Sequence, residues 1–511
     1  MSQQGPNNIT PPDEFLDRVL DIYHRGLSVD AFKLAETVAP LARWSGARAG
    51  TLASGIASNV GAPRLSARLV VRTWRAHRTN LDAQEYYCFL LLEKRGPFAT
   101  WQWLNKIPEA TEATAEARAN MFGVRARIAT SLRNFSAAEK FLEQAEVALP
   151  NVPWVRLQRA HLLEQTEKVT EALEVARSAC DLHKYPFYRP AVQTCAYLLQ
   201  LLDRKDEAID LLQRADASLQ NSHVAAQLYV LYTETQRWAE AGAELDRYET
   251  LCPAMELPVR RWLTGQRARV AYFRGERAAA AQLACELPDK FNERFAENLK
   301  LPAPAVERVA LDVPYVRQHF KTCAPATLAA LGRFWKMAAD QLVIVEAVCY
   351  DGTPGWEQRK WAEENGWIAR EFLVTWDSAV DLLSAGIPFA LTTSEATSAH
   401  MQAVTGFDRT RGTLLLRDPS QPISLEADAV PFLERYKAFG PTGIVFMPRS
   451  EARRLDGIKL PETALHDIRY EMARALSRHD RAQAVCAIKQ IEACAPEHRL
   501  TWEARLQLAY Y

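Results

Sequence analysis

Apolar residues recur every three to four positions along most of the first 290 residues, in runs of about a dozen residues separated by short polar turns. This spacing predicts amphipathic α-helices joined in pairs. Four segments show the same pattern, with a small residue early in the second helix of each pair: "NFSAAEKFLEQAEVALP", "KVTEALEVARSACDLHKYP", "RKDEAIDLLQRADASLQ" and "RWAEAGAELDRYETLCP". We therefore expect a succession of helical hairpins.

The small residue returns at a nearly constant interval. Steps of 36, 32, 39, 34, 36 and 33 residues separate seven alanines, at positions 31, 67, 99, 138, 172, 208 and 241. A period near 34, with small residues where helices cross and prolines closing several units, resembles the tetratricopeptide repeat over roughly residues 13 to 290. The sequence thus predicts an α-helical solenoid over residues 1–300.

Residues 305–450 break this pattern. Glycine and proline become more frequent, and short apolar or alternating runs predict strands at "IAREFLV", "PFALTT", "MQAVTGF", "GTLLLRD" and "GIVFMP", the last three joined by hairpin-type turns. Helices are expected at 323–336, 338–349 and 377–384, with a fourth at 356–365. These elements predict an α+β module inserted near the C-terminal end of the solenoid.

Helical repeats are expected again over residues 455–511. "ARALSRHDRAQAVCAIKQIEACAP" predicts one more hairpin, and "HRLTWEARLQLAYY" the first helix of another. Because that last helix ends on exposed-type apolar residues, we expect the chain to continue in the natural protein or to pack against a partner.

Cys323 is the candidate nucleophile of the α+β module. It begins the apolar helix "CAPATLAALGRFW", where the positive end of a helix favours a thiolate. The module's other cysteine, Cys349, ends an apolar helix and is better explained as a core residue. Since His319 and His400 are the only histidines here, few residues can serve as the base.

His400 is the preferred base because it begins the strand "HMQAVTGF". If Asp408 faces Thr413 across the following turn, Ala403 lies opposite Asp418, which brings that carboxylate near His400. His319 is expected to be a surface or rim residue, and Asp408 lies too far along the strand. A simple turn role for Asp418 is the alternative.

Gln318, five residues before Cys323, is the candidate oxyanion donor, together with the backbone N–H of Cys323. The alternative is that it merely caps its loop. Trp356, Trp361 and Trp367 either line a cleft or pack one helix face, and packing is the simpler interpretation.

These four residues occur in an order that resembles papain-like cysteine peptidases of the bacteriocin-processing type, which remove leader peptides after a double glycine. The resemblance covers about residues 311–450. It implies Cys323 as nucleophile, His400 as base, Asp418 as orienting residue and Gln318 as oxyanion donor. The family usually has glycine where this chain has Ala324.

Composition narrows the remaining possibilities. The 62 Lys and Arg residues balance the 62 Asp and Glu residues, and no basic stripe favours nucleic acid. No membrane span or signal peptide is expected, and nine scattered cysteines without a CxxC pair fit buried thiols in a cytoplasmic protein. We expect no nucleotide, metal or flavin cofactor.

Two functions follow from these expectations. The first is a cysteine peptidase or related amide-bond hydrolase whose helical repeats recruit a peptide or protein substrate, with acyl transfer or deamidation as variants of the same chemistry. The second is a dormant peptidase-like scaffold that only binds a protein partner.

Overall fold

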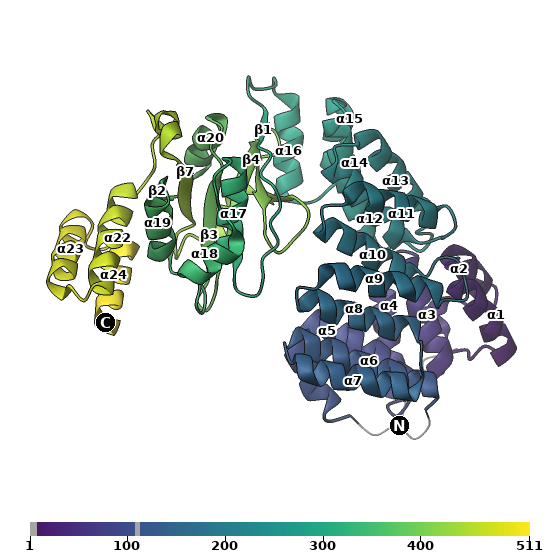
Figure 1. Cartoon of the computed structure of the whole chain (residues 1–511). Coiled ribbons are helices and arrows are strands. Elements are labelled where there is room, and N and C mark those ends of the chain that lie inside the picture. Colours follow the sequence, from purple (N-terminus) through teal and green to yellow (C-terminus); the bar gives the residue numbers. More distant parts are fainter. Residues whose placement is uncertain (1–7, 108–112) are drawn as a thin grey trace. The chain divides into compact units, whose positions relative to one another are not determined.

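The computed structural model describes residues 8–107 and 113–511, and the chain forms two compact units, one ending at Leu287 and one spanning Pro288–Tyr511. The first is a helical solenoid and the second contains an antiparallel sheet with helices (Figure 1). The predicted fold class is therefore confirmed.

The first unit consists of helices connected as antiparallel hairpins. α5 changes direction at Gly96, which has φ 77° and precedes Pro97, so this helix supplies both arms of its hairpin. The helices are α1 (Asp13–His24), α2 (Ser28–Glu36), α3 (Ala47–Asn59), α4 (Pro63–Ala76), α5 (Leu81–Leu104), α6 (Ala115–Ser131), α7 (Phe135–Ala148), α8 (Pro153–Gln165), α9 (Val169–Asp181), α10 (Arg189–Leu201), α11 (Lys205–Asp216), α12 (Ser222–Glu234), α13 (Trp238–Thr250), α14 (Leu257–Phe273) and α15 (Arg277–Cys285), with a short 3₁₀ turn at Leu41–Arg43.

Small residues allow the two helices of a hairpin to approach closely. The alanines that mark the period at 138, 172, 208 and 241 are all 0 % exposed. Gly123 of α6 shows the same constraint between successive hairpins, because a Cβ there would lie 2.4 Å from the ring of Trp154 in α8. The period seen in the sequence is thus the spacing of helix-crossing points.

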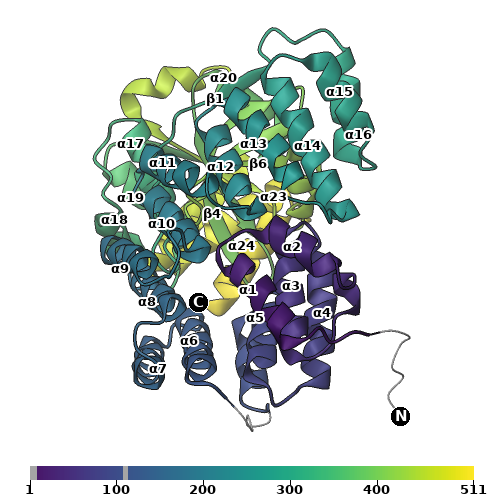
Figure 2. The ribbon, with the colours of Figure 1, turned by 90° about the vertical axis from the view of Figure 1, so that its right-hand side faces the viewer.

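The solenoid curves until its beginning meets its end. Leu27 forms a bridge with Gln220, the Ser222 hydroxyl donates to the Asn59 carbonyl at 2.8 Å, and Glu256 accepts from the backbone of the α4 N-terminus. Figure 2 shows this coil, with α6 to α9 on one side and α1 to α4 on the other. The first helices of successive hairpins therefore face an enclosed inner surface.

The second unit is built on an antiparallel sheet with the strand order β2-β7-β3-β4-β5-β6, to which β1 adds by pairing with β4. The strands are β1 (Arg308–Ala310), β2 (Trp367–Leu373), β3 (Phe389–Ser394), β4 (Ala399–Asp408), β5 (Thr413–Arg417), β6 (Leu425–Asp428) and β7 (Thr442–Pro448).

Helices cover both faces of this sheet, which explains why β4 is buried almost throughout. Apolar side chains of α17 (Cys323–Phe334) pack on one face with Trp367, Met401 and Phe446. Those of α20 (Trp376–Ser384) pack on the other with Phe389 and Phe407. The remaining elements are α18 (Gln341–Val348), α19 (Gly355–Glu364), α21 (Ala429–Arg435) and a 3₁₀ helix at Arg449–Leu455.

The five strands expected from the sequence are present, but their connections differ in one respect. The predicted hairpin between "GTLLLRD" (β5) and "GIVFMP" (β7) is wrong. β6 and α21 lie between these two strands in the chain, and β7 pairs with β2 and β3. Trp367 is 1 % exposed in the core, in agreement with its expected packing role.

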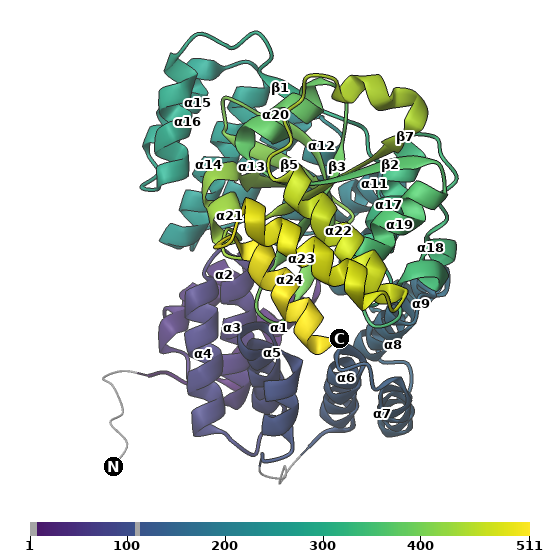
Figure 3. The same cartoon turned by 90° about the vertical axis from the view of Figure 1, so that its left-hand side faces the viewer.

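Helices at both ends of the second unit pack on the sheet module. α16 (Lys290–Lys300) is attached by ion pairing of Arg294 with Asp428 at 2.5 Å. At the other end lie α22 (Thr463–Ser477), α23 (Arg481–Cys494) and α24 (Arg499–Tyr510) (Figure 3). Arg359 of α19 pairs with Asp467 of α22 at 2.7 Å. The C-terminal helices are therefore attached to the α+β module by an ion pair between a buried arginine and a partly exposed aspartate.

Candidate active site

Cys323 is the first residue of α17, whose following residues Ala324 to Gly332 are all buried. Because the helix starts here, the backbone N–H of Cys323 has no partner within the helix. The side chain itself is half-buried. This combination gives the thiol access to solvent at the positive end of a rigidly packed helix.

His400 lies near the start of β4 and joins the thiol to a carboxylate. Its Nε2 lies 3.0 Å from Oδ2 of Asp418, which follows the last residue of β5. The imidazole and the Cys323 thiol also act on each other, since each shifts the pKa of the other. The three residues predicted as a triad are thus brought together.

The electrostatics of the triad favour an ion pair. Hydrogen bonds to Asp418 and to Cys323 raise the pKa of His400 to about 10, against the effect of burial. Burial opposes ionisation of the Cys323 thiol, but His400 and the backbone N–H groups of Met401 and Ala324 outweigh it and lower the pKa of the thiol. A thiolate beside an imidazolium is the reactive form of a catalytic cysteine.

Ser420 holds the carboxylate, a role that the sequence interpretation missed. Its backbone N–H and its hydroxyl both donate to Oδ1 of Asp418, at 2.8 and 2.7 Å. Oδ2 is thereby left for His400. The Asp-Pro-Ser stretch carried the signal, since aspartate commonly accepts such a bond from the residue two positions later.

Gln318 lies on the loop before α17 and is tied to the same turn. Its backbone N–H donates to the carbonyl of Pro419 at 2.9 Å, directly beside Asp418. The side-chain Oε1 is buried and has no hydrogen-bond partner among the described residues. The backbone of Gln318 is therefore anchored beside Asp418, and its unpaired side-chain atom is a hydrogen-bond acceptor.

Thr327 fastens α17, which carries Cys323, to β4, which carries His400. Its buried hydroxyl, one turn after Cys323, donates to the carbonyl of Met401 at 3.2 Å, and Met401 directly follows His400. This bond fixes the distance between the two elements that carry the thiol and the imidazole.

The rival residues occupy other environments. Asp408 is fully buried, pairs with Arg308 at 3.2 Å and accepts from the backbone N–H of Arg411. The backbone N–H of His319 is bound to the Thr322 hydroxyl in the loop before α17. Cys349 is not a core residue as expected: it is half-buried, and its thiol donates to the carbonyl of Lys321 at 3.5 Å.

The register between β4 and β5 differs by one residue from the expected one. Asp408 faces Thr413, as predicted, but Ala403 faces Arg417 and not Asp418, because a bulge interrupts the pairing between Val404 and Gly406. The carboxylate nevertheless reaches His400, since it follows directly after the end of β5.

A protein-family model described as "Peptidase_C39 like family" matches residues 310–444. This part of the chain is therefore similar to that family. The match contains Cys323, His400, Asp418 and Gln318. A solved structure similar to this domain is the peptidase domain of Streptococcus ComA, a bi-functional ABC transporter, at 18 % identity, over 27 % of this chain and 99 % of that one, with a TM-score of 0.23.

Solved structures of tetratricopeptide repeat proteins are also similar to parts of the chain. One is a tetratricopeptide repeat protein from Parabacteroides merdae, with 14 % identity over 49 % of this chain and 96 % of that one, and a TM-score of 0.30. Another is YrrB, described as having an unusual peptide-binding site, with 13 % identity over 41 % and 97 % and a TM-score of 0.27. No curated protein matches the sequence. No helix in the described parts of the chain is long and apolar enough to cross a membrane.

Proposed function

We propose that the protein is a cysteine peptidase, or a related amide-bond hydrolase, that uses a Cys323–His400–Asp418 triad. The observation that carries the proposal is the 3.0 Å contact between His400 and Asp418, beside a Cys323 thiol whose pKa burial raises but His400 helps to lower below its ordinary value. The C39-like match supports the reaction class.

The triad would act in two stages. The Cys323 thiolate attacks the carbonyl carbon of an amide, and the backbone N–H of Cys323 and the amide of Gln318 stabilise the oxyanion. His400 gives its proton to the leaving amine, which leaves a thioester. His400 then takes a proton from water, the resulting hydroxide attacks the thioester, and the acid product leaves as the thiolate re-forms.

The helical unit would recruit the peptide or protein substrate, as solenoids commonly bind partners on their concave surface. The same thioester serves acyl transfer when an amine replaces water and deamidation when the substrate is glutamine. A cytoplasmic location remains part of this proposal.

The experiment is cleavage of a proteome-derived peptide library by the full-length protein, with new termini identified by mass spectrometry. We expect a set of new termini with the wild type that is absent with Cys323→Ala. The second candidate, a dormant scaffold, is favoured by Ala324, which is buried and carries a methyl group where the related peptidases have glycine. Equal results for both proteins, with an unchanged pattern of bound partners, would favour the scaffold.

A further inference from the structure

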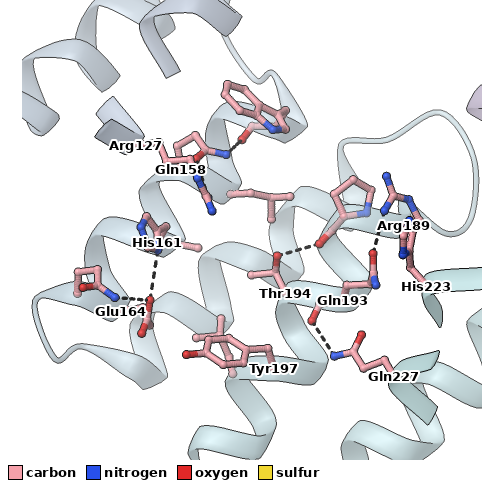
Figure 4. A pocket seen from close by; sticks show the side chains of 16 residues that line it. Arg127, Gln158, His161, Glu164, Arg189, Gln193, Thr194, Tyr197, His223 and Gln227 are labelled. Carbon is pink, nitrogen blue, oxygen red and sulfur yellow. Dashed lines mark hydrogen bonds and ion pairs between the residues drawn. The ribbon is translucent and has the colours of Figure 1, made fainter. Parts of the chain in front are cut away.

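A polar groove runs along the inner surface of the solenoid. It is lined by the first helices of four successive hairpins, α6, α8, α10 and α12, and has a volume of about 870 Å³ (Figure 4). A hollow of about 470 Å³ extends it toward α3 and α5 and shares Trp154, Arg189 and His223 with it. This volume suits a peptide segment of several residues.

Two arginines in the groove have amide partners and no acidic partner. Nη1 of Arg127 donates to Oε1 of Gln158 at 3.4 Å, and Nη1 of Arg189 donates to Oε1 of Gln193 at 3.0 Å. In the described parts of the chain, neither guanidinium forms an ion pair. Elsewhere in the same unit, arginines such as Arg177 and Arg204 pair with glutamates.

Neighbouring ionisable groups supply only part of the negative charge that would balance the two arginines. Burial, followed by repulsion from Asp82, raises the pKa of Glu85 to about 8, so this carboxyl is mostly neutral near pH 7. Burial and then the charge of Arg189 lower the pKa of His223 to about 4. Glu164 acts on Arg127 through space, but its Oε2 lies 3.2 Å from His161. Among the described residues that line the groove, two arginines therefore stand against one acidic residue, Glu164.

Glutamines at equivalent positions of three successive hairpins give the groove a repeated amide pattern. Gln158, Gln193 and Gln227 are separated by 35 and 34 residues and all line it. Nε2 of Gln227 donates to the carbonyl of Gln193 at 3.3 Å, whereas its Oε1 is buried and has no partner among the described residues. A primary amide offers both a donor and an acceptor, which matches the needs of a peptide backbone.

We propose that this groove binds an extended peptide segment with acidic side chains, in which carboxylates pair with Arg127 and Arg189 and the glutamines contact the peptide backbone. Arg127 lies on α6 and Arg189 on α10, with α8 between them, so the two arginines are two helix spacings of about 8–10 Å apart. An extended chain advances about 3.3 Å per residue. The two carboxylates should therefore be about five or six residues apart in the peptide. This inference gives a chemical class to the partner in the recruitment part of the proposed function, and it does not depend on the chemistry of Cys323.

The test is selection of a randomised, N-acetylated and C-amidated decapeptide library on the immobilised full-length Cys323→Ala protein. We expect retained peptides to be enriched in Asp and Glu. A retained peptide and its copy with Gln for Glu are then titrated by fluorescence anisotropy. The acidic peptide binds more tightly, by about tenfold per carboxylate, and loses that advantage at high salt.

Arg127→Gln and Arg189→Gln should each weaken binding by about tenfold, the loss typical of one charge-assisted hydrogen bond. Arg177→Gln is the matched control, because Arg177 lies on α9, outside the groove, and should leave binding unchanged. Arg127→Lys keeps the charge and should keep most of the affinity, which guards against a folding defect in the glutamine variant.

No acidic enrichment, or equal enrichment with Arg189→Gln, would overturn the inference. The negative charge could come from acidic side chains or from the C-terminal carboxylate of the peptide. The Gln copy is therefore also made with a free C-terminal carboxylate. If this copy recovers the lost affinity, the groove binds a terminal carboxylate and the inference is overturned. The proposed chemistry is read separately, from alkylation of Cys323 in Arg189→Gln, so the two proposals can fail independently.

Discussion

Replacing Asp418 with asparagine removes the charge that orients His400 and keeps its geometry nearly unchanged. Asp418 is the largest cause of the raised pKa of His400, which is about 10. A hydrogen bond between charged groups contributes about 1.5–3 kcal/mol, and the 34 % exposure of the imidazole side chain reduces this to about 1–2 kcal/mol. The thiolate–imidazolium pair should therefore become about 5- to 30-fold less populated.

The assay is the second-order rate of Cys323 alkylation by iodoacetamide, measured by peptide mass spectrometry from about pH 5 to pH 10. An ordinary thiol is only about 0.3 % ionised at pH 6, so the Asp418→Asn protein should react more slowly there. The greater nucleophilicity of its more basic thiolate offsets part of the loss.

The sign of the pH dependence follows from the pKa of His400 in the wild type and in the Asp418→Asn protein. In the wild type, His400 keeps its proton up to about pH 10 and stabilises the thiolate. In the variant, it loses the proton nearer to pH 6.5 and the thiol ionises later. The difference in rate should be largest near pH 6 and vanish above about pH 9–10. It also shrinks where Asp418 becomes protonated, which happens below the ordinary aspartate pKa of about 3.9, because burial raises the pKa of Asp418 but hydrogen bonds with His400 and Ser420 lower it further.

Asp408→Asn is the matched control, because Asp408 is an aspartate of the same hairpin that pairs with Arg308 and does not contact His400. Its Cys323 rate should stay within about twofold of the wild type. Equal rates for Asp418→Asn and the wild type at pH 6, or an equal loss in the control, would refute the assigned role of Asp418.

Three further variants test the surroundings of the triad. Ser420→Ala removes one of two bonds to Asp418 and should slow alkylation at pH 6 by about threefold to tenfold, with recovery in Ser420→Thr; an unchanged rate would contradict the positioning role. Thr327→Val leaves the Met401 carbonyl without its partner and should reduce the free energy of unfolding in urea by about 1–2 kcal/mol, whereas no change would show that the bond is unimportant. Gln318→Ala should reduce amide turnover about 100-fold and leave alkylation unchanged; equal loss in both assays would argue against an oxyanion role.

The predictable parts of the structure are those that local patterns determine. The period near 34 reports how often helices cross, and the buried alanines at those crossings carry that signal directly. Cys323 was recognisable because it opens an apolar helix, and His400 because it opens an apolar strand. Both residues stand near the start of an element whose periodicity identifies it, whereas Gln318 lies on a loop.

The parts that were not predicted depend on contacts between distant segments. The bulge in β4 lies next to the residues that pair with β1. A Cβ on Gly406 would approach the Val309 carbonyl to 2.2 Å. A three-residue strand 96 positions upstream leaves no local signal of that contact. The inner groove depends likewise on how α6, α8, α10 and α12 stack, which follows from small rotations between successive hairpins.

The central claim is that Cys323 is held as an activated thiolate. The most direct measurement is the difference in ultraviolet thiolate absorbance between the wild type and Cys323→Ser, followed through a pH titration of the full-length protein. We expect the thiolate absorbance of Cys323 to rise with a midpoint below the ordinary thiol pKa of about 8.5. Asp418→Asn should move this midpoint to a higher pH. A midpoint at or above the ordinary value in the wild type would contradict it.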